Sequence, residues 1–257
     1  MHLRNWKLSV CRKAVMTGFS VITLSTFAPS ARASLVFNGS FESTTNGPGQ
    51  MGYNTDATGW TNESDGVGDD GYNFIFASGT ADSTGSNGIY GNLQLWGPNN
   101  GSANGLPASS PDGGNFVAAD GAFEIGAIEQ TISGLVAGDV YTVGFWWAGA
   151  QQSGFTGPNT EQWQVSFGSE QLSTPVYSNP SEGFSGWMYQ TFNFTADNTS
   201  DVLSFLAVGT PNGEPPFSLL DGVSVQAAPE PGTLLLMLGG LGLVGLGVVR
   251  SKRRSKV

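Results

Sequence analysis

Carboxylates and aromatic rings are the only side chains with evident chemical potential in the body of this chain. The 257 residues include 20 Asp and Glu, all between Glu42 and Glu230. Every Lys and Arg, the single His and the single Cys lie outside residues 34–249. This body therefore carries a formal charge of −20, against −10 for the whole chain. Such side chains can ligate hard cations or, as carboxylate pairs, hydrolyse glycosides.

The missing residue types exclude several classes of function. Without His or Cys, the body cannot form a Ser-His-Asp triad or use a thiol nucleophile, and it lacks the usual nitrogen and sulfur ligands of zinc. Without Lys or Arg it has no cation to hold phosphates, and its negative charge repels nucleic acid. We therefore expect a non-catalytic protein with no nucleic-acid partner.

Carboxylates without a neighbouring cation repel one another and oppose compaction. Calcium is the cation that best suits an all-oxygen set of ligands. One acidic loop runs from Asp65 to Asp70, but it lacks the twelve-residue pattern of an EF-hand. This loop is either a weak divalent-cation site or a solvated turn.

Six tryptophans lie in the body and could stack against the flat faces of sugar rings. Trp96 borders a long loop. Trp147 follows Trp146 on an expected strand, so one of the two should point outward. We expect Trp96 and Trp147 to be ligand platforms, the alternative being that both belong to the core.

The elements that must position these groups are β-strands. Segments rich in β-branched and aromatic residues recur between Asn-Gly, Asp-Gly and Gly-Pro turn signals, and several alternate with period two. The expected fold is all-β, a jelly-roll β-sandwich. The long segments Thr44–Gly71 and Gly97–Gly114 are expected to be loops, either functional or mobile. The expected strands are Leu35–Glu42, Tyr72–Ala77, Ile89–Trp96, Asn115–Asp120, Ala127–Ile132, Val140–Ala148, Glu161–Phe167, Trp187–Thr195, Val202–Val208 and Phe217–Val225.

The N-terminus has the features of a secretory signal peptide. A basic stretch from Arg4 to Lys13 precedes a mostly apolar run, Ala14 to Ala28, and an Ala-Arg-Ala pattern ends at Ala33. The sequence predicts a signal peptide at residues 1–33, the alternative being a first core helix. Cleavage would leave residues 34–228 as one exported domain, with no cysteine for a disulfide.

The C-terminus combines three parts in a fixed order: Pro229-Glu230-Pro231, an apolar run at 233–249, and a basic tail from Arg250. The run has the length of a short membrane span, and the tail should stay cytoplasmic. This end, residues 229–254, resembles the PEP-CTERM sorting signal. The resemblance implies that Pro229, Glu230 and Pro231 are recognised by an exosortase. The protein would be anchored in the inner membrane of a Gram-negative bacterium, then moved to the cell surface or extracellular matrix. The alternative is an ordinary C-terminal anchor.

The body resembles the galactose-binding-like jelly rolls, which include carbohydrate-binding modules of families 4, 9, 16 and 22. The motifs that carry this resemblance are Leu35–Glu42 with Gly59-Trp60, Ile128–Ile132, Gly138–Phe145, and Leu219–Val225. The resemblance implies a structural Ca²⁺ held by Glu42, Asp221 and a carbonyl near Gly39 or Ser40, with Asp112 a weaker candidate. Asp221-Gly222-Val223 departs from the usual Asp-Asp-Val or Asp-Asn-Val. The alternative is that Glu42 and Asp221 are ordinary solvated or capping carboxylates.

Three functions fit these observations. The first is an exported, non-catalytic surface protein whose calcium-stabilised jelly roll contacts extracellular polysaccharide. The second is a purely structural acidic matrix protein without a defined ligand. The third is a glycosidase that uses two carboxylates, for example Glu124 with Glu129 or Glu161 with Glu170.

Overall fold

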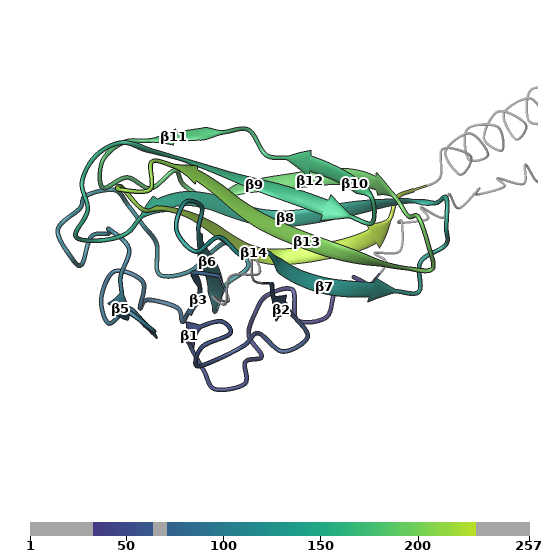
Figure 1. Ribbon diagram of the computed structural model, residues 1–257, viewed down its shortest axis with the longest axis horizontal. Helices are drawn as coiled ribbons and strands as arrows, with labels where there is room; N and C mark the ends of the chain where they lie inside the picture. The colour runs from purple at the N-terminus through teal and green to yellow at the C-terminus, as the bar shows by residue number, and fades with distance from the viewer. Residues whose placement is uncertain (1–32, 64–70, 230–257) are drawn as a thin grey trace, which may run out of the picture. The chain divides into compact units, whose positions relative to one another are not determined.

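The structure is a computed structural model, and it describes residues 33–63 and 71–229 (Figure 1). The expected signal peptide lies outside these residues except for Ala33. The acidic loop Asp65–Asp70, the expected membrane span 233–249, and Glu230 and Pro231 of the sorting motif also lie outside them.

The described residues form β-strands and no helix, so the predicted all-β class is confirmed. Their strands are β1 (Gly49–Gln50), β2 (Thr61–Asn62), β3 (Asn73–Phe76), β4 (Ser86–Gly88), β5 (Gly91–Leu93), β6 (Phe116–Asp120), β7 (Ile128–Ser133), β8 (Val140–Gln151), β9 (Asn159–Phe167), β10 (Glu170–Ser173), β11 (Tyr177–Asn179), β12 (Met188–Thr195), β13 (Ser200–Thr210) and β14 (Pro216–Ala227).

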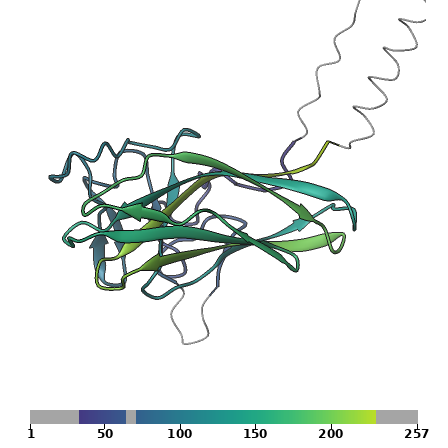
Figure 2. The same ribbon diagram turned by 90° about the horizontal axis from the view of Figure 1, so that it is seen from above.

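Two antiparallel sheets form the predicted sandwich. Sheet A has the order β1-β3-β6-β14-β8-β12, and sheet B has the order β10-β9-β13-β7-β2, with β11 also paired to β9. Strands β4 and β5 form a separate ribbon. The long strands of both sheets extend side by side in two perpendicular views (Figures 1 and 2). Strands that are distant in sequence are neighbours, so each sheet depends on long-range pairing.

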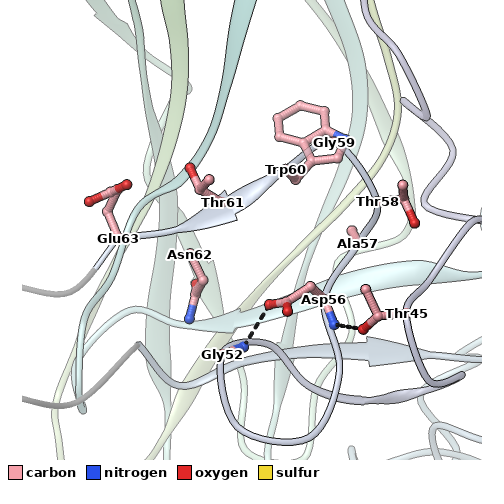
Figure 3. Close-up of a pocket in the computed structure, with 10 residues that line it drawn as sticks. All are labelled: Thr45, Gly52, Asp56, Ala57, Thr58, Gly59, Trp60, Thr61, Asn62 and Glu63. Carbon is pink, nitrogen blue, oxygen red and sulfur yellow. Dashed lines mark hydrogen bonds between the residues drawn. The ribbon is translucent and has the colours of Figure 1, made fainter.

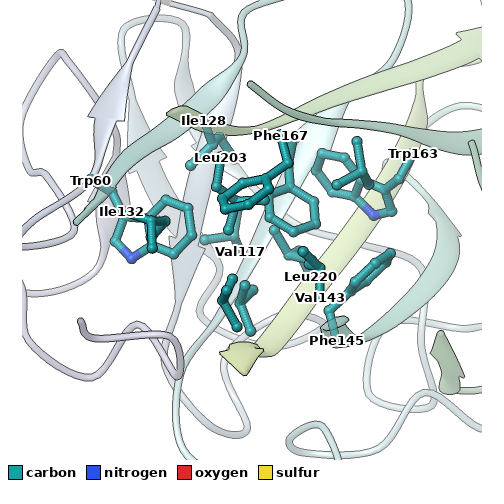
Figure 4. Close-up of a cluster of buried hydrophobic side chains, with 14 of the residues drawn as sticks. Trp60, Val117, Ile128, Ile132, Val143, Phe145, Trp163, Phe167, Leu203 and Leu220 are labelled. Carbon is teal, nitrogen blue, oxygen red and sulfur yellow. The ribbon is translucent and has the colours of Figure 1, made fainter. Parts of the chain in front are cut away.

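The main core fills the space between the two sheets. Strand β9 shows how the sequence builds it, because Trp163, Val165 and Phe167 alternate with polar residues and are completely buried. The Trp163 indole N–H donates to the Leu219 carbonyl of sheet A over 3.0 Å, which ties the sheets together. Figure 4 shows part of this cluster, including Trp60, Val117, Ile128, Ile132, Val143, Phe145, Leu203 and Leu220.

A second core covers part of the opposite face of sheet A. Successive residues of a strand point to opposite faces, so Ala148 and Leu219 face away from the main core, whereas their neighbours Trp147 and Leu220 face into it. Leu93, Leu95 and Leu106 cover this second face. The segment 77–115 is therefore a packed layer over the sheet.

Two expectations about the chain organisation are wrong, namely the strand at Leu35–Glu42 and the loop at Thr44–Gly71, which contains β1 and β2. The segment Leu35–Glu42 is not a strand, because Asn38 and Phe41 have positive φ angles of 52° and 55°. The segment Gly97–Gly114 contains no strand, as expected for a loop, and it packs against the domain. Leu106 is 6% exposed in the second core, and the Ser110 hydroxyl is hydrogen-bonded to Asp221.

Candidate functional site

A row of three side chains crosses the outer face of sheet A. Trp146 of β8 is the cross-strand partner of Asp221 on β14 and of Tyr189 on β12. Its neighbours Phe145 and Trp147 belong to the main core, so Trp146 points to the other face. The row places a carboxyl group, an indole and a phenol side by side.

Trp146 and Tyr189 form an aromatic pair with ring centroids 5.0 Å apart and an angle of 57° between the rings. Tyr189 is 54% exposed and Trp146 is partly buried. Gly144 lies beneath Tyr189, since a Cβ at this glycine would come within 2.4 Å of the phenol oxygen. The glycine therefore allows the tyrosine ring to lean over the sheet.

Polar side chains extend this surface along the sheet. Ser224 and Thr191 flank Gly144 in the register, and Gln226 and Asn193 flank the next outward residue, Thr142. The Thr142 hydroxyl donates to the Asn193 side-chain oxygen over 2.8 Å. We call this surface the platform: Thr142, Gly144, Trp146, Tyr189, Thr191, Asn193, Ser224 and Gln226. It joins exposed ring area with amide and hydroxyl groups.

The two tryptophans predicted as ligand platforms differ in burial. The prediction for Trp147 is wrong, because it is 3% exposed within the main core. Trp146 occupies the outward position instead. Trp96 is partly exposed, and its indole N–H donates to the Phe155 carbonyl over 2.7 Å. The period-two pattern of β12 places Tyr189 on an outward face, but its pairing with Trp146 depends on strand register.

Asp221 is the centre of a carboxylate cluster. It is completely buried on β14, beside a register shift between Asp221 and Ser224. The Ser110 hydroxyl donates to its Oδ2 and the Gly222 N–H to its Oδ1. Burial raises the pKa of Asp221 to about 8 against the lowering effect of these hydrogen bonds, and the charges of Asp112 and Glu42 raise it further.

These interactions bring three of the four predicted calcium ligands into one neighbourhood. Asp112 also lies close to Gly222, and Glu42 accepts the Asn115 N–H over 2.7 Å. Ser40 is partly buried next to Gly39, whose carbonyl accepts the Val223 N–H over 2.9 Å. Across residues 33–63 and 71–229, however, no group of three or more Asp, Glu, His or Cys side chains has an arrangement that could hold a metal ion.

A separate open hollow of about 490 Å³ lies along residues 56–63 (Figure 3). The Asp56 carboxylate accepts the Gly52 N–H, and the Asp56 N–H donates to Thr45. Trp60 borders the hollow, but it is 4% exposed and its indole N–H donates to the Asn38 carbonyl. This tryptophan belongs to the core and offers no ring face for stacking.

Glu161 is a second buried carboxyl group, on β9. One oxygen accepts a hydrogen bond from the Asn179 amide over 3.2 Å, and the other has no hydrogen-bond partner. Burial raises the pKa of Glu161 to about 8. Glu170 pairs with Phe167 at the far end of β9, so the two glutamates are about 20 Å apart along the strand. They therefore do not form the carboxylate pair of a glycosidase.

The strand that carries Asp221 leads directly into the sorting sequence. β14 ends at Ala227, the Ala228 N–H donates to the Val140 carbonyl over 2.9 Å, and Pro229 is exposed. Residues 227–254 match a family model described as the PEP-CTERM protein-sorting motif. The chain carries a PEP-CTERM motif. This motif implies export, anchoring at the membrane, and processing by an exosortase. In the described part of the chain, no helix is long and apolar enough to cross a membrane.

The PEP-CTERM motif covers only the C-terminal end of the chain. The search of curated proteins found no match. Among solved structures, the body is similar to a family 61 carbohydrate-binding module in complex with β-1,4-galactotriose, at 17% identity over 77% of this chain and 100% of the other, with a TM-score of 0.38.

Two further structures are similar to the body of this chain. One is the K2 cleaved adhesin domain of Lys-gingipain, at 17% identity over 75% of this chain and 98% of the other, with a TM-score of 0.41. The other is the xylan-binding CBM22-1 domain of Xyn10C from Paenibacillus barcinonensis, at 10% identity over 78% and 99%, with a TM-score of 0.37.

Buried Glu161 gives a prediction about stability and pH. Its pKa is about 8 in the folded protein against 4.5 when exposed, so its contribution to stability is complete below pH 4.5 and is lost as the pH rises through 8. The free energy of unfolding should fall between pH 5 and pH 8, by up to about 1.4 kcal/mol per pH unit from this group. Glu161→Gln should reduce this slope in urea titrations.

Glu170→Gln is the matched control, because Glu170 is exposed on β10 and the chemical change is the same. It should leave the pH slope of the native protein unchanged. Equal slopes in Glu161→Gln and the native protein would contradict the prediction that Glu161 contributes to the pH dependence of stability.

Proposed function

We propose that this chain is a non-catalytic cell-surface or extracellular-matrix protein that an exosortase delivers and that contacts extracellular polysaccharide through the platform. The PEP-CTERM motif at residues 227–254 supports the delivery route. The Trp146–Tyr189 pair above Gly144 is the single observation that carries the binding role. An exposed ring face beside hydroxyl and amide groups can take the apolar face of a sugar and hydrogen-bond to its hydroxyls.

The rest of the delivery pathway is part of the same proposal. Residues 1–33 would direct export, and the segment 233–249 would hold the protein in the inner membrane of a Gram-negative bacterium. The exosortase would then recognise Pro229, Glu230 and Pro231. The domain at residues 34–228 would remain at the surface, where its negative charge would also attract hydration and cations.

A test of binding compares two exposed tyrosines. Tyr189→Ala should weaken binding to the host's own exopolysaccharide by about five- to thirtyfold, since an aromatic anchor contributes about 1–2 kcal/mol. Tyr53→Ala is the matched control, because Tyr53 is also 54% exposed but lies outside the platform. Affinity gel electrophoresis or calorimetry would measure the difference. If no polysaccharide retains the native protein, the purely structural matrix role replaces this proposal.

A test of delivery replaces Pro229, Glu230 and Pro231 together with alanine. The variant should keep its C-terminal segment and stay in the membrane fraction, whereas the native protein should lose the segment and reach the surface. Glu170→Ala, which removes one negative charge from exposed β10, should be processed normally. Mass spectrometry of cell fractions gives the result. Identical masses and fractions for the triple variant and the native protein would refute the role of these residues.

We also propose that Ca²⁺ stabilises the neighbourhood of Asp221. Its donors are oxygen atoms, which suit this ion, and repulsion among Asp221, Asp112 and Glu42 would be relieved by a cation. Since the described side chains do not assemble a three-carboxylate group, most of the six to eight ligands would be main-chain carbonyls and water.

Millimolar Ca²⁺ should raise the melting temperature of the purified protein by about 5 °C or more, the shift expected when the ion exceeds its dissociation constant about a hundredfold. Chelation should reverse the increase. Asp112→Asn should remove the response, and Asp56→Asn, the same change outside the cluster, should preserve it. Identical melting curves in chelator and in Ca²⁺ would exclude a stabilising calcium site.

A further inference from the structure

An aromatic cavity of about 320 Å³ lies where β6 ends and β14 begins. Asp120, the last residue of β6, pairs with Phe217 of β14, and Tyr72 lies just before β3. Gln152 and Asn212 add amide groups from the ends of β8 and β13. Strand ends from both sheets therefore converge on this cavity, which is separate from the platform.

Four aromatic rings line the cavity. Tyr72 and Phe123 meet edge to face with centroids 5.4 Å apart, and Tyr90 contacts Phe123 in the same way at 5.8 Å. Tyr90, Phe123 and Phe155 are 61%, 37% and 40% exposed. Large apolar rings that remain exposed around a cavity offer their negative π-faces to a ligand.

The floor of the cavity contains a carboxyl group with an unused acceptor. Asp120 lines the cavity and is 1% exposed. Its Oδ1 accepts the Ala122 and Phe123 N–H groups over 2.8 and 3.1 Å, but its Oδ2 is buried without a hydrogen-bond partner. A buried acceptor left unpaired is costly, so a donor supplied by a ligand would be stabilising here.

The charges around the cavity favour one kind of hydrogen-bond donor for Asp120. The Tyr90 hydroxyl donates to Glu124 over 2.5 Å, which places a second carboxylate beside the rings. Burial raises the pKa of Tyr72 to about 12, with further contributions from Asp120, Glu124 and Tyr90. Residues 34–249 contain no Lys or Arg to offset these charges. The cavity therefore repels anions and favours a positively charged donor.

We propose that this cavity binds an ammonium group, supplied by an amino sugar of the extracellular polysaccharide. The rings would surround the cation and the apolar face of the sugar, while Oδ2 of Asp120 would accept the ammonium N–H and the amide groups of Gln152 and Asn212 would meet its hydroxyls. The volume is at the lower end of the range for small-ligand pockets, which suits one sugar unit. This inference rests on the proposed polysaccharide binding and specifies its chemistry.

The raised pKa of Asp120 fits a positively charged ligand. Burial raises the pKa of this carboxyl group to about 7, against the lowering effect of its two main-chain hydrogen bonds, and Glu124 raises it further. An ammonium ion next to Oδ2 would favour the ionised carboxylate and release a proton. Acidic sugars, in contrast, would place a negative charge near the Glu124 carboxylate and would oppose ionisation of Asp120.

The decisive experiment compares two oligomers with the same backbone, one of glucosamine and one of N-acetylglucosamine, by calorimetry at pH 6 and low salt. The native protein should bind the glucosamine oligomer at least tenfold more tightly. Asp120→Asn can keep the Oδ1 contacts with Ala122 and Phe123 but loses the negative charge, so it should remove this preference. Phe155→Ala should weaken binding of the same oligomer, because the cation loses one ring.

Asp56→Asn is the control for overall charge, because it removes one carboxylate outside the cavity while leaving an acceptor for the Gly52 N–H. It should retain the preference. Equal affinity for both oligomers, an unchanged preference in Asp120→Asn, or no binding of either oligomer would overturn the proposal. If exopolysaccharide binding survives and remains sensitive to Tyr189→Ala, only the amine site fails. If all polysaccharide binding is absent, the proposed function fails as well.

Discussion

Every carboxyl group in the body must be accommodated without a side-chain cation. Residues 34–249 contain no Lys or Arg, so an internal ion pair with these residues cannot form. At Asp221, Ser110 and Gly222 supply hydrogen bonds, and at Asp120 two main-chain N–H groups do so. These hydrogen bonds lower the two pKa values by less than burial raises them, so both carboxyl groups keep a raised pKa. The remaining means of neutralisation are a proton or a cation from outside the chain.

This constraint connects stability with binding. Where a buried carboxyl group has no partner atom, as at Glu161 Oε2 and Asp120 Oδ2, the folded protein favours the protonated form at moderate pH. A site in the interior of the sandwich, such as Glu161, contributes only to the dependence of stability on pH. Asp120 instead lines a cavity, so the same physical imbalance can be relieved by a ligand.

The strand pattern predicted the sheets better than the sites. The expected strand Glu161–Phe167 corresponds to β9, where Trp163, Val165 and Phe167 share one face and are completely buried, because side chains alternate in direction along a strand. Alternation alone could not show which of Trp146 and Trp147 points outward, because both faces of sheet A are partly covered. That covering comes from the segment 77–115, which includes the expected loop Gly97–Gly114. The sequence pattern also does not determine the order of strands in a sheet. The row formed by Asp221, Trp146 and Tyr189 depends on that order, so it could not be predicted.

The two proposed binding surfaces lie along one strand, which limits how a single ligand could use them. Trp146 of the platform lies on β8 and Gln152 of the cavity directly follows β8, so the two are six residues or about 20 Å apart. Between them, Ala148 and Ala150 are covered by the second core. A short oligosaccharide would therefore occupy one surface at a time. A polymer could reach both, and the gain in effective concentration would strengthen binding without any additional contact.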